Sequence, residues 1–402
     1  MKICVVTSLH KPYSRGGAEV VAETIIQELA KRHDLSVVTI EPFHGMRSLR
    51  FRRIYDGTIA MYRYYPLNIF SLISIQNHHF LVRFFWHLFD IFNIHSCIVV
   101  ARIILRERPE CVFTHNIKGI GYLLPLLFRF LGIRHIHTMH DVQLLTPSGL
   151  MRTDSVQGRV LSCISALYRI LCKMLFGSPF AVIFPSQYLL QAHQQYGFFP
   201  NSRSVHLQNP SDFHIKSSEI QGMRDAFLFL GQLELHKGIH FLLDAWKSLP
   251  KNGVQLIIAG SGSCAARVCE AAGRDSRVVY VGHQTREQVN SLFSIVRFTV
   301  IPTLCAENAP MVVRESLLAG VPVIVTDSGG AAELIRDGEN GYIITPGIIS
   351  ELTAILQKAA TLTEHEYQTL SKNALATAQT FLTVEQYCSK LEELNSPSTP
   401  LT

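Results

Sequence analysis

Short apolar runs alternate with helical patterns along the chain, and this alternation occurs twice within its 402 residues. A stripe with helical spacing, formed by Val21, Ile25 and Leu29, follows the first run. In the first half, runs with the length and β-branched content of buried parallel strands fall at 2–7, 35–40, 110–114, 135–139 and 181–185. Strands separated by helices predict a parallel, doubly wound sheet.

The same rhythm starts again after about residue 222. Six further strand candidates follow, each ended by glycine or a turn residue: 226–230, 255–259, 278–281, 298–302, 321–326 and 342–345. A chain of this length exceeds one compact core and suits two domains. We therefore predict an α/β fold of two Rossmann-like, doubly wound domains, 1–210 and 222–364, facing each other across a cleft. A polar linker at 211–222 joins them, and 395–402 is a frayed tail.

This fold alone does not define a function. Open α/β sheets bind ligands at the carboxyl ends of their strands, and two such sheets serve dehydrogenases, kinases, epimerases and transferases alike. The functional evidence therefore has to come from particular residues at those strand ends.

The segment from Glu307 to Gly320 is the most informative one. Pro310 suits the first position of a helix and Gly320 the position just past its end, which predicts a short helix at about 310–319. Eight helical steps advance roughly 12 Å, so Glu307 and Glu315 cannot form a close acid–base pair. They can instead bracket an elongated ligand.

The start of this predicted helix suits a phosphate group, because its free amides and the helix dipole favour negative charge. A nucleotide sugar fits the layout, with its sugar on Glu307, its ribose on Glu315 and its diphosphate between them. The segment that would hold the diphosphate comprises Asn308, Ala309, Pro310, Met311 and Val312. Either carboxylate alone also suits a helix cap or a surface charge, but their order around a helix start favours a ligand site.

The Glu307-x7-Glu315 spacing resembles the hallmark of the retaining glycosyltransferases of family 4, which have the GT-B architecture. The resemblance extends from Ser14–Glu19 through Gly329–Glu333 to Asp337–Gly341. It implies that Glu307 contacts the donor sugar and Glu315 the nucleotide ribose. It also implies that a helix over 365–394 crosses back to the first domain. Enzymes of this architecture typically need no metal, so the resemblance implies no cofactor besides the nucleotide-sugar co-substrate.

A second segment, Gly231–Gly238, resembles the family's Gly-Arg…Lys-Gly pattern, in which both cations neutralise the leaving diphosphate. Lys237 matches the lysine, whereas Gln232 stands where arginine is usual. A neutral amide replaces a charged, rigid fork there. The substitution predicts weaker donor binding, use of another cation such as Arg314, a different leaving group, or lost activity.

The first half supplies a third set of candidates. Gly16 and Gly17 follow the first strand, open a helix at Ala18 and let backbone amides approach a ligand, although a glycine pair alone is usually only a turn. In the family this loop lies beside the donor phosphates and the acceptor.

Two histidines each follow a strand candidate of the first half. A lone histidine at a strand end is more often structural, but the pairs His115-Asn116 and His140-Asp141 at adjacent strand ends favour function. The resemblance assigns His140 to the donor sugar. We place His115, Asn116 and Asp141 on the acceptor side.

No carboxylate is a good candidate for the nucleophile of a double displacement. The resemblance implies transfer on one face of the sugar, with Glu307, Lys237 and His140 as the catalytic residues. The resemblance implies a glycan or lipid-linked glycan as the acceptor, in surface-polysaccharide biosynthesis. Two alternatives stay open: a GT-B nucleotide-sugar 2-epimerase and a non-catalytic nucleotide-sugar binding protein. A nicotinamide dehydrogenase is disfavoured because neither half has Gly-x-Gly-x-x-Gly after its first strand.

Charge and apolar patterning suggest a membrane partner. Residues 1–180 hold 21 Lys and Arg against 11 Asp and Glu, whereas the remainder holds 16 against 20. The basic and aromatic stretches 51–54 and 80–89 predict either a surface that rests on anionic lipid or a helix packed on the sheet. Because Arg83, Asp90 and Arg102 interrupt the most apolar segment, we expect no membrane-spanning helix.

Nine cysteines without a CxxC pair indicate reduced thiols in a cytoplasmic protein, which would associate with the membrane from its cytoplasmic face. No nucleic-acid-binding module is recognisable, so we expect no nucleic-acid partner.

Overall fold

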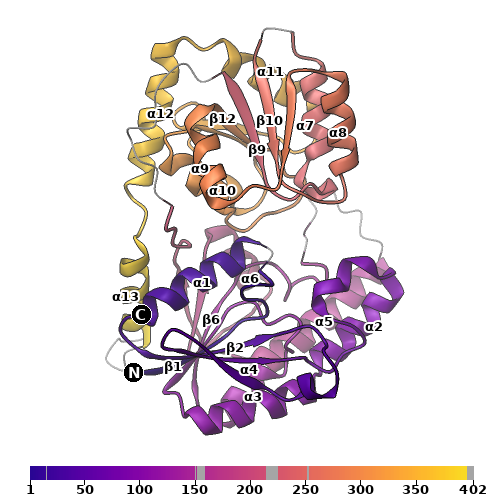
Figure 1. The fold of residues 1–402 in the computed structure, drawn as a ribbon, viewed down its shortest axis with the longest axis vertical. Coiled ribbons are helices and arrows are strands. Elements are labelled where there is room, and N and C mark those ends of the chain that lie inside the picture. The colour runs from indigo at the N-terminus through magenta and orange to yellow at the C-terminus, as the bar shows by residue number, and fades with distance from the viewer. Residues whose placement is uncertain (15, 150, 152–158, 214–224, 251–252, 396–402) are drawn as a thin grey trace. The chain divides into compact units, whose positions relative to one another are not determined.

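The fold is given by a computed structural model that describes residues 1–14, 16–149, 151, 159–213, 225–250 and 253–395 (Figure 1). The chain divides into two compact units. Unit 1 comprises 1–150, 156–210 and 382–402, and unit 2 comprises 151–155 and 211–381.

Unit 1 contains an eight-stranded sheet in the order β3-β4-β2-β1-β5-β6-β7-β8. Only the β3–β4 pair is antiparallel among the pairings of the described sheet. The five strands predicted for this half are confirmed within one residue at each end. The strands are β1 (Lys2–Val6), β2 (Asp34–Ile40), β3 (Arg52–Asp56), β4 (Ile59–Tyr64), β5 (Cys111–Thr114), β6 (Arg134–Thr138), β7 (Ala181–Phe184) and β8 (Arg203–His206).

Helices cover the sheet of unit 1. The predicted stripe Val21, Ile25 and Leu29 is buried on α1, which packs against α13, while α4 contacts both α3 and α5. The helices are α1 (Gly17–Leu29), α2 (Phe80–Ile91), α3 (Ile94–Glu107), α4 (Leu124–Phe130), α5 (Arg159–Phe176), α6 (Gln187–Gln195) and α13 (Val384–Asn395). Two 3₁₀ turns, η1 (Met46–Leu49) and η2 (Leu72–Asn77), lie between β2 and α2.

The charged residues Arg83, Asp90 and Arg102 do not by themselves exclude a membrane span in this unit. The segment Leu81–Glu107 is long and apolar enough, by length and composition, to cross a membrane. The segment contains too few charged residues to be excluded by its composition. Core helices of soluble proteins have the same length and composition, so these properties are weak evidence for a span. In the structure the segment is divided into α2 and α3, because the Asn93 side chain accepts from Ser96 N and starts a new helix.

Unit 2 contains a six-stranded, parallel sheet in the order β11-β10-β9-β12-β13-β14. The strand order reverses between β9 and β12, which makes their carboxyl ends the topological switch point of the sheet. All six predicted strands are confirmed with small shifts. They are β9 (Ala226–Leu230), β10 (Gln255–Ala259), β11 (Val278–Gly282), β12 (Val296–Ile301), β13 (Val323–Thr326) and β14 (Gly341–Ile344).

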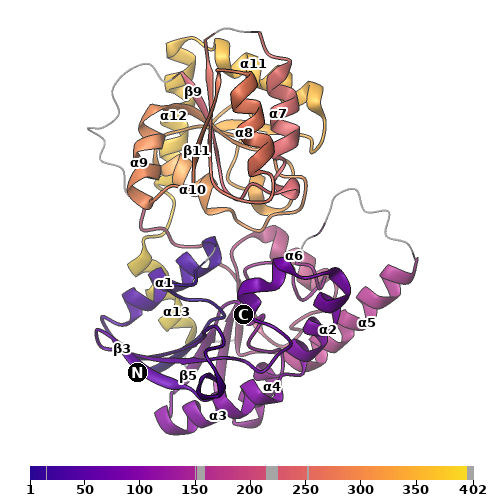
Figure 2. The same cartoon turned by 45° about the vertical axis from the view of Figure 1, so that its right-hand side comes forward.

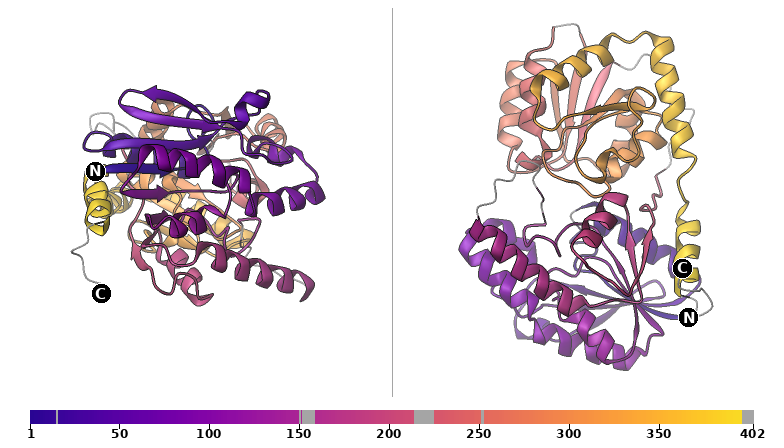
Figure 3. Two further views of the ribbon diagram at one scale, coloured as in Figure 1. Left: turned by 90° about the horizontal axis from the view of Figure 1, so that it is seen from below. Right: turned by 180° about the vertical axis from the view of Figure 1, so that it is seen from behind.

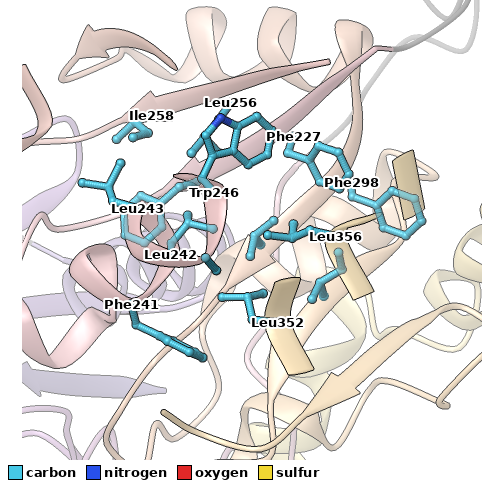
Figure 4. Close-up of a cluster of buried hydrophobic side chains, with 14 of the residues drawn as sticks. Phe227, Phe241, Leu242, Leu243, Trp246, Leu256, Ile258, Phe298, Leu352 and Leu356 are labelled. Carbon is cyan, nitrogen blue, oxygen red and sulfur yellow. The ribbon is translucent and has the colours of Figure 1, made fainter. Parts of the chain in front are cut away.

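The main core of unit 2 forms where its sheet meets two helices. Figure 4 shows Phe227 of β9, Trp246 of α7, Phe298 of β12 and Leu352 of α11 in one buried cluster. The helices are α7 (Ile239–Lys247), α8 (Ala265–Arg274), α9 (Arg286–Ile295), α10 (Met311–Leu318), α11 (Ile349–Thr361) and α12 (Glu364–Ala378). Two 3₁₀ turns, η4 (Leu235–Lys237) and η5 (Gly330–Ala332), lie near the carboxyl ends of β9 and β13.

The helix predicted over 365–394 is two helices in different units. α12 packs on α10 in unit 2, and α13 packs on α1 in unit 1. The break has a local cause, since Thr383 Oγ1 accepts from Gln386 N at 3.1 Å and Gln386 Oε1 accepts from Thr383 N at 3.0 Å. This reciprocal capping starts α13. In unit 1, His33 Nε2 then lies 2.7 Å from Glu392 Oε1 and fixes α13 to the end of α1.

The first residues of the predicted linker 211–222 pack within unit 2. Phe213 is buried in a core cluster of unit 2 and meets Phe293 edge to face, so the chain has already entered unit 2 there. Residues 214–224 lie outside the described part of the chain, as does the predicted tail from 396 onward.

Candidate functional site

The candidate residues of unit 2 come from the loops that follow β9 and β12, the two strands at its switch point. Lys237 follows β9, and Glu307 follows β12 just before α10. This arrangement explains why two segments 70 residues apart in sequence meet at one edge of the sheet.

The loop after β9 contacts the loop after β12 at Gly238. Gly238 has φ 75°, and a Cβ there would lie 1.7 Å from the carbonyl oxygen of Pro302, so no other residue fits. His236 O accepts hydrogen bonds from Leu304 N at 2.8 Å and from Thr303 Oγ1 at 3.2 Å. The position of Lys237 is therefore fixed by its immediate neighbours.

The backbone of Glu307 is fixed by the glycine pair Gly329-Gly330. Gly330 N donates to Glu307 O at 2.7 Å, and Gly329 forms an isolated parallel bridge with Glu307. Gly329 has φ 69°, and a Cβ there would lie 2.4 Å from Glu307 O. The loop after β13 can therefore contact the Glu307 backbone closely, because positions 329 and 330 are both glycine.

The side chains of Lys237 and Glu307 form a salt bridge. Lys237 Nζ donates to Glu307 Oε1 at 2.7 Å, with 28% of the lysine side chain and 12% of the glutamate side chain exposed. The cation predicted for the diphosphate and the acid predicted for the sugar thus neutralise one another in this structure.

The helix start predicted to hold a phosphate lies directly after Glu307. α10 begins at Met311, so Pro310 is its N-cap and not its first residue. The first backbone bond of this turn runs from Val313 N to Pro310 O at 3.1 Å, so the amides of Met311 and Val312 precede the helical ladder. Asn308 and Ala309, both half-buried, connect Glu307 to this helix start.

Glu315 lies buried inside α10 and meets an arginine that the sequence did not indicate. Arg286 Nη1 donates to Glu315 Oε1 and Arg286 Nη2 to Asp212 Oδ1, each at 2.8 Å, and its guanidinium lies over the Phe213 ring. Burial raises the pKa of Glu315, and the charge of Arg286 opposes that rise. Glu315 is therefore a carboxylate held by one partly exposed cation.

Sequence reasoning missed Arg286 and Asp212. Arg286 lies 29 residues before Glu315, and Asp212 lies 74 residues before Arg286. Neither stands in a recognisable motif. Only the β11–α9 connection brings Arg286 to α10.

Neither Gln232 nor Arg314 adds a positive charge beside Lys237. Gln232 is exposed, and its backbone carbonyl oxygen accepts a hydrogen bond from Glu234 N at 3.0 Å. Arg314, considered as a substitute cation, is buried at 2% exposure with its guanidinium 3.9 Å from the centre of the Phe381 ring. Because it points into the packing between α10 and the end of α12, Arg314 does not supply the charge that Gln232 lacks.

In unit 1, the glycine loop caps its own helix. α1 begins at Gly17 and not at Ala18, and Glu19 Oε2 accepts from Gly16 N at 2.8 Å. A carboxylate thus already lies at this helix start, where a phosphate was predicted to approach.

The two histidines of unit 1 are in contact. His115 follows β5, His140 follows β6, and His115 Nδ1 lies 3.0 Å from His140 Nε2. Burial lowers the pKa of His140 to about 4 and that of His115 well below its ordinary value. At neutral pH both rings are uncharged, so one nitrogen donates and the other accepts.

Asp141 and Asn116 take part in local turns. Asp141 Oδ1 accepts from Gln143 N at 2.7 Å, and burial raises the pKa of Asp141 to about 6. Asn116 Oδ1 accepts from Lys118 N at 3.1 Å. Both side chains shape the loops that carry the histidines.

Across the described residues, no group of three or more His, Cys, Asp or Glu side chains is placed to hold a metal ion. The positive charge at the switch point of unit 2 comes from Lys237 and the α10 start.

Two Rossmann-type units with candidate ligand residues at their strand ends define a protein of GT-B architecture. Residues 15–214 match the family model Glycosyltransferase Family 4, and residues 210–376 match Glycosyl transferases group 1. The chain therefore belongs to the family 4, group 1 glycosyltransferases of the GT-B type.

Known relatives are distant. An uncharacterized 42.6 kDa protein in the cps region of Klebsiella pneumoniae is 26% identical over 86% of this chain and 90% of its own length. The lipopolysaccharide 1,2-N-acetylglucosaminetransferase of Salmonella typhimurium is 25% identical over 42% of this chain and 50% of its own length. Among solved structures, HepE from Anabaena in complex with UDP has a TM-score of 0.69 at 19% identity, covering 98% of this chain and 99% of its own.

Proposed function

We propose that this glycosyltransferase moves a sugar from a nucleotide-diphosphate donor to a glycan or lipid-linked glycan, with retention of the anomeric configuration, in the synthesis of a surface polysaccharide. The observation that carries the proposal is the Lys237–Glu307 pair at the start of α10, with Glu315 further along the same helix. The UDP bound by HepE and the lipopolysaccharide named in the Salmonella relative support the donor class and the setting.

Donor binding would exchange the partner of Lys237. A diphosphate carries more negative charge than one carboxylate, so Lys237 Nζ would turn to it from the Glu307 oxygen 2.7 Å away. Glu307, still held through its backbone by Gly330, would then accept a hydroxyl of the donor sugar. The α10 amides would bind the remaining phosphate oxygens.

In the proposed reaction, the bond between the anomeric carbon and the phosphate oxygen breaks, and a bond to the acceptor oxygen forms on the same face. The acceptor proton moves to the departing phosphate oxygen. Lys237 and the helix start stabilise the charge that develops on the diphosphate. His140, uncharged above pH of about 4, would position a sugar hydroxyl without adding charge. We propose that this protein charge replaces a divalent metal, in which case EDTA leaves the transfer rate unchanged.

The test is a panel of nucleotide sugars given to the full-length chain with and without a mixture of glycan acceptors. The expected product is an elongated acceptor, detected by mass spectrometry, whose new anomeric proton has the configuration of the donor by NMR. A product of inverted configuration would contradict the one-face reaction.

The same panel separates the two alternatives. Conversion of a nucleotide sugar without any acceptor indicates an epimerase. A donor that raises the melting temperature but is never consumed indicates a binding protein, as expected if Gln232 has removed the charge needed for turnover.

A further inference from the structure

The outer helices of unit 1 expose a large amount of apolar side chain. More than half of the exposed large hydrophobic residues in the described part of the chain lie on α2 to α5 or at the α2–α3 turn. Leu167 is 69% exposed and Phe130 is 87% exposed. We define the α2–α5 apolar face by six of these residues: Phe84, Phe89, Ile94, Phe130, Leu167 and Met174. Apolar exposure of this extent marks an interaction site in a folded protein.

These helices form one layer. α4 contacts α3 on one side and α5 on the other, and α2 leads directly into α3. Figures 1 and 2 and the right panel of Figure 3 show α2 and α5 at the side of unit 1 away from α13. The exposed residues therefore belong to a common layer of the unit.

The inward side of α2 is already anchored. Trp86 is buried and its Nε1 donates to Phe70 O at 2.7 Å, while Asp90 Oδ2 accepts from Gly119 N at 2.9 Å. Because these contacts fix the face of α2 that meets the protein, Phe84 and Phe89 are held outward.

The charges on this layer are predominantly positive at the surface. Asp90 is buried, and Glu107 has 12% of its side chain exposed and accepts from the Tyr62 hydroxyl. In the described part of α2 to α5 no exposed carboxylate is present. The exposed or half-exposed charged residues are Arg83, Arg102, Arg106, Arg129, Arg169 and Lys173.

We propose that the α2–α5 apolar face rests on an anionic lipid bilayer, with its apolar side chains among the acyl chains and its basic side chains at the headgroups. A symmetric dimer through this face would bring the same basic residues against each other. A membrane span is disfavoured, because Val99, Val100, Ile103 and Ile104 of α3 are buried in unit 1. The face therefore lies on the bilayer and does not cross it.

Co-sedimentation with vesicles tests the proposal. The full-length chain should sediment with phosphatidylcholine vesicles that contain phosphatidylglycerol, and much less with phosphatidylcholine alone. The triple variant Phe84→Ser, Leu167→Ser and Met174→Ser should lower the partition coefficient by at least about tenfold, given the loss of three apolar insertions. The pair Arg83→Glu and Arg102→Glu should lower it by a similar factor and weaken its dependence on salt.

A control variant changes exposed apolar residues outside this face. Met46→Ser with Ile348→Ser, at 75% and 46% exposure, should leave vesicle binding unchanged. The proposal is overturned if the wild-type chain stays in solution at low salt, or if the triple variant binds as the wild type does. It is also overturned if the chain is a dimer that the triple variant dissociates, as measured by light scattering.

This inference rests on the proposed function, because a lipid-linked acceptor would be presented at such a surface. The membrane contact and the transfer reaction can nevertheless be disproved independently. Transfer to a water-soluble acceptor should be equal in the wild type and the triple variant. Loss of transfer with retained vesicle binding would count against the proposed reaction alone.

Discussion

Lys237 Nζ and Glu307 Oε1 lie 2.7 Å apart, so the cation and the acid near the start of α10 are bound to each other. Each is held by a glycine that no larger residue can replace, Gly238 behind Lys237 and Gly329 behind Glu307. The pair is thus pre-positioned by backbone packing, and the side chains are the only parts that have to move.

Replacing Lys237 by alanine should lower kcat for sugar transfer by about 100- to 1000-fold, because the leaving diphosphate loses its main protein charge. Its effect on stability should stay under about 1 kcal/mol, since the lysine side chain is partly exposed. Steady-state kinetics and thermal melting measure both. The control is Lys247→Ala, a lysine with 65% of its side chain exposed on α7, which should transfer normally. A normal rate in Lys237→Ala would move the charge-neutralising role to another group.

Replacing Glu307 by glutamine keeps the shape of the side chain and removes the charge that binds Lys237. We expect transfer to fall by about 100-fold or more, because the sugar hydroxyl loses a charged acceptor in the transition state. Donor affinity, measured by calorimetry, should change much less. Glu339→Gln, at an exposed position, is the matched control. Wild-type turnover in Glu307→Gln would remove this carboxylate from the site.

Arg286 should act through Glu315 and not on the reacting atoms. Arg286→Met leaves the buried carboxylate without its cation, which should raise the donor KM by about tenfold and leave kcat within about twofold. Thermal stability should fall by about 1–3 kcal/mol. Arg286→Lys should restore part of the KM, because one of the two hydrogen bonds can be kept. An equal loss of kcat and kcat/KM would instead indicate direct contact with the transition state.

Asp90 should make unit 1 less stable as pH rises. Burial raises the pKa of Asp90 to about 7, above its ordinary value of 3.8, so the folded state favours the protonated form. The stability that protonation supplies is complete below about pH 4 and is lost as pH rises through 7. Asp90→Asn should therefore lose less melting temperature than the wild type between about pH 4 and pH 8. Asp34→Asn, at an exposed position, should follow the wild-type curve; parallel curves for all three proteins would contradict the assignment.

The sequence predicted most of the parallel strands because each is a continuous apolar run buried on both faces. It missed β3 and β4, where Arg52, Arg53 and Arg63 interrupt the apolar pattern at one edge of the sheet, and the short, half-buried β8 at the other edge. It also merged α12 and α13, because the helical periodicity of 364–378 and 384–395 continues across a short break that only the Thr383 cap marks.

The candidate site was predictable where a motif lies within one segment, as with Glu307, α10 and Gly320. The partners of those residues were not predictable in the same way. Arg286 reaches Glu315 only because β11 and β12 lie on opposite sides of β9 and β10 in the sheet order, which no local pattern shows. The burial of Arg314 likewise depends on Phe381, more than sixty residues later in the chain.

The return of α13 to unit 1 has a consequence for synthesis. Asn395 Nδ2 donates to Cys111 Sγ at 3.3 Å, and Tyr387 is fully buried, so the last described turn of the chain completes the interior of unit 1, which otherwise comes from residues before 211. A ribosome must therefore synthesise the chain through residue 395 before unit 1 can close. A premature stop codon between residues 345 and 382 would leave α1 without its neighbour while sparing every described strand, and an expression design for unit 1 alone has to carry residues 382–395 as a fused segment.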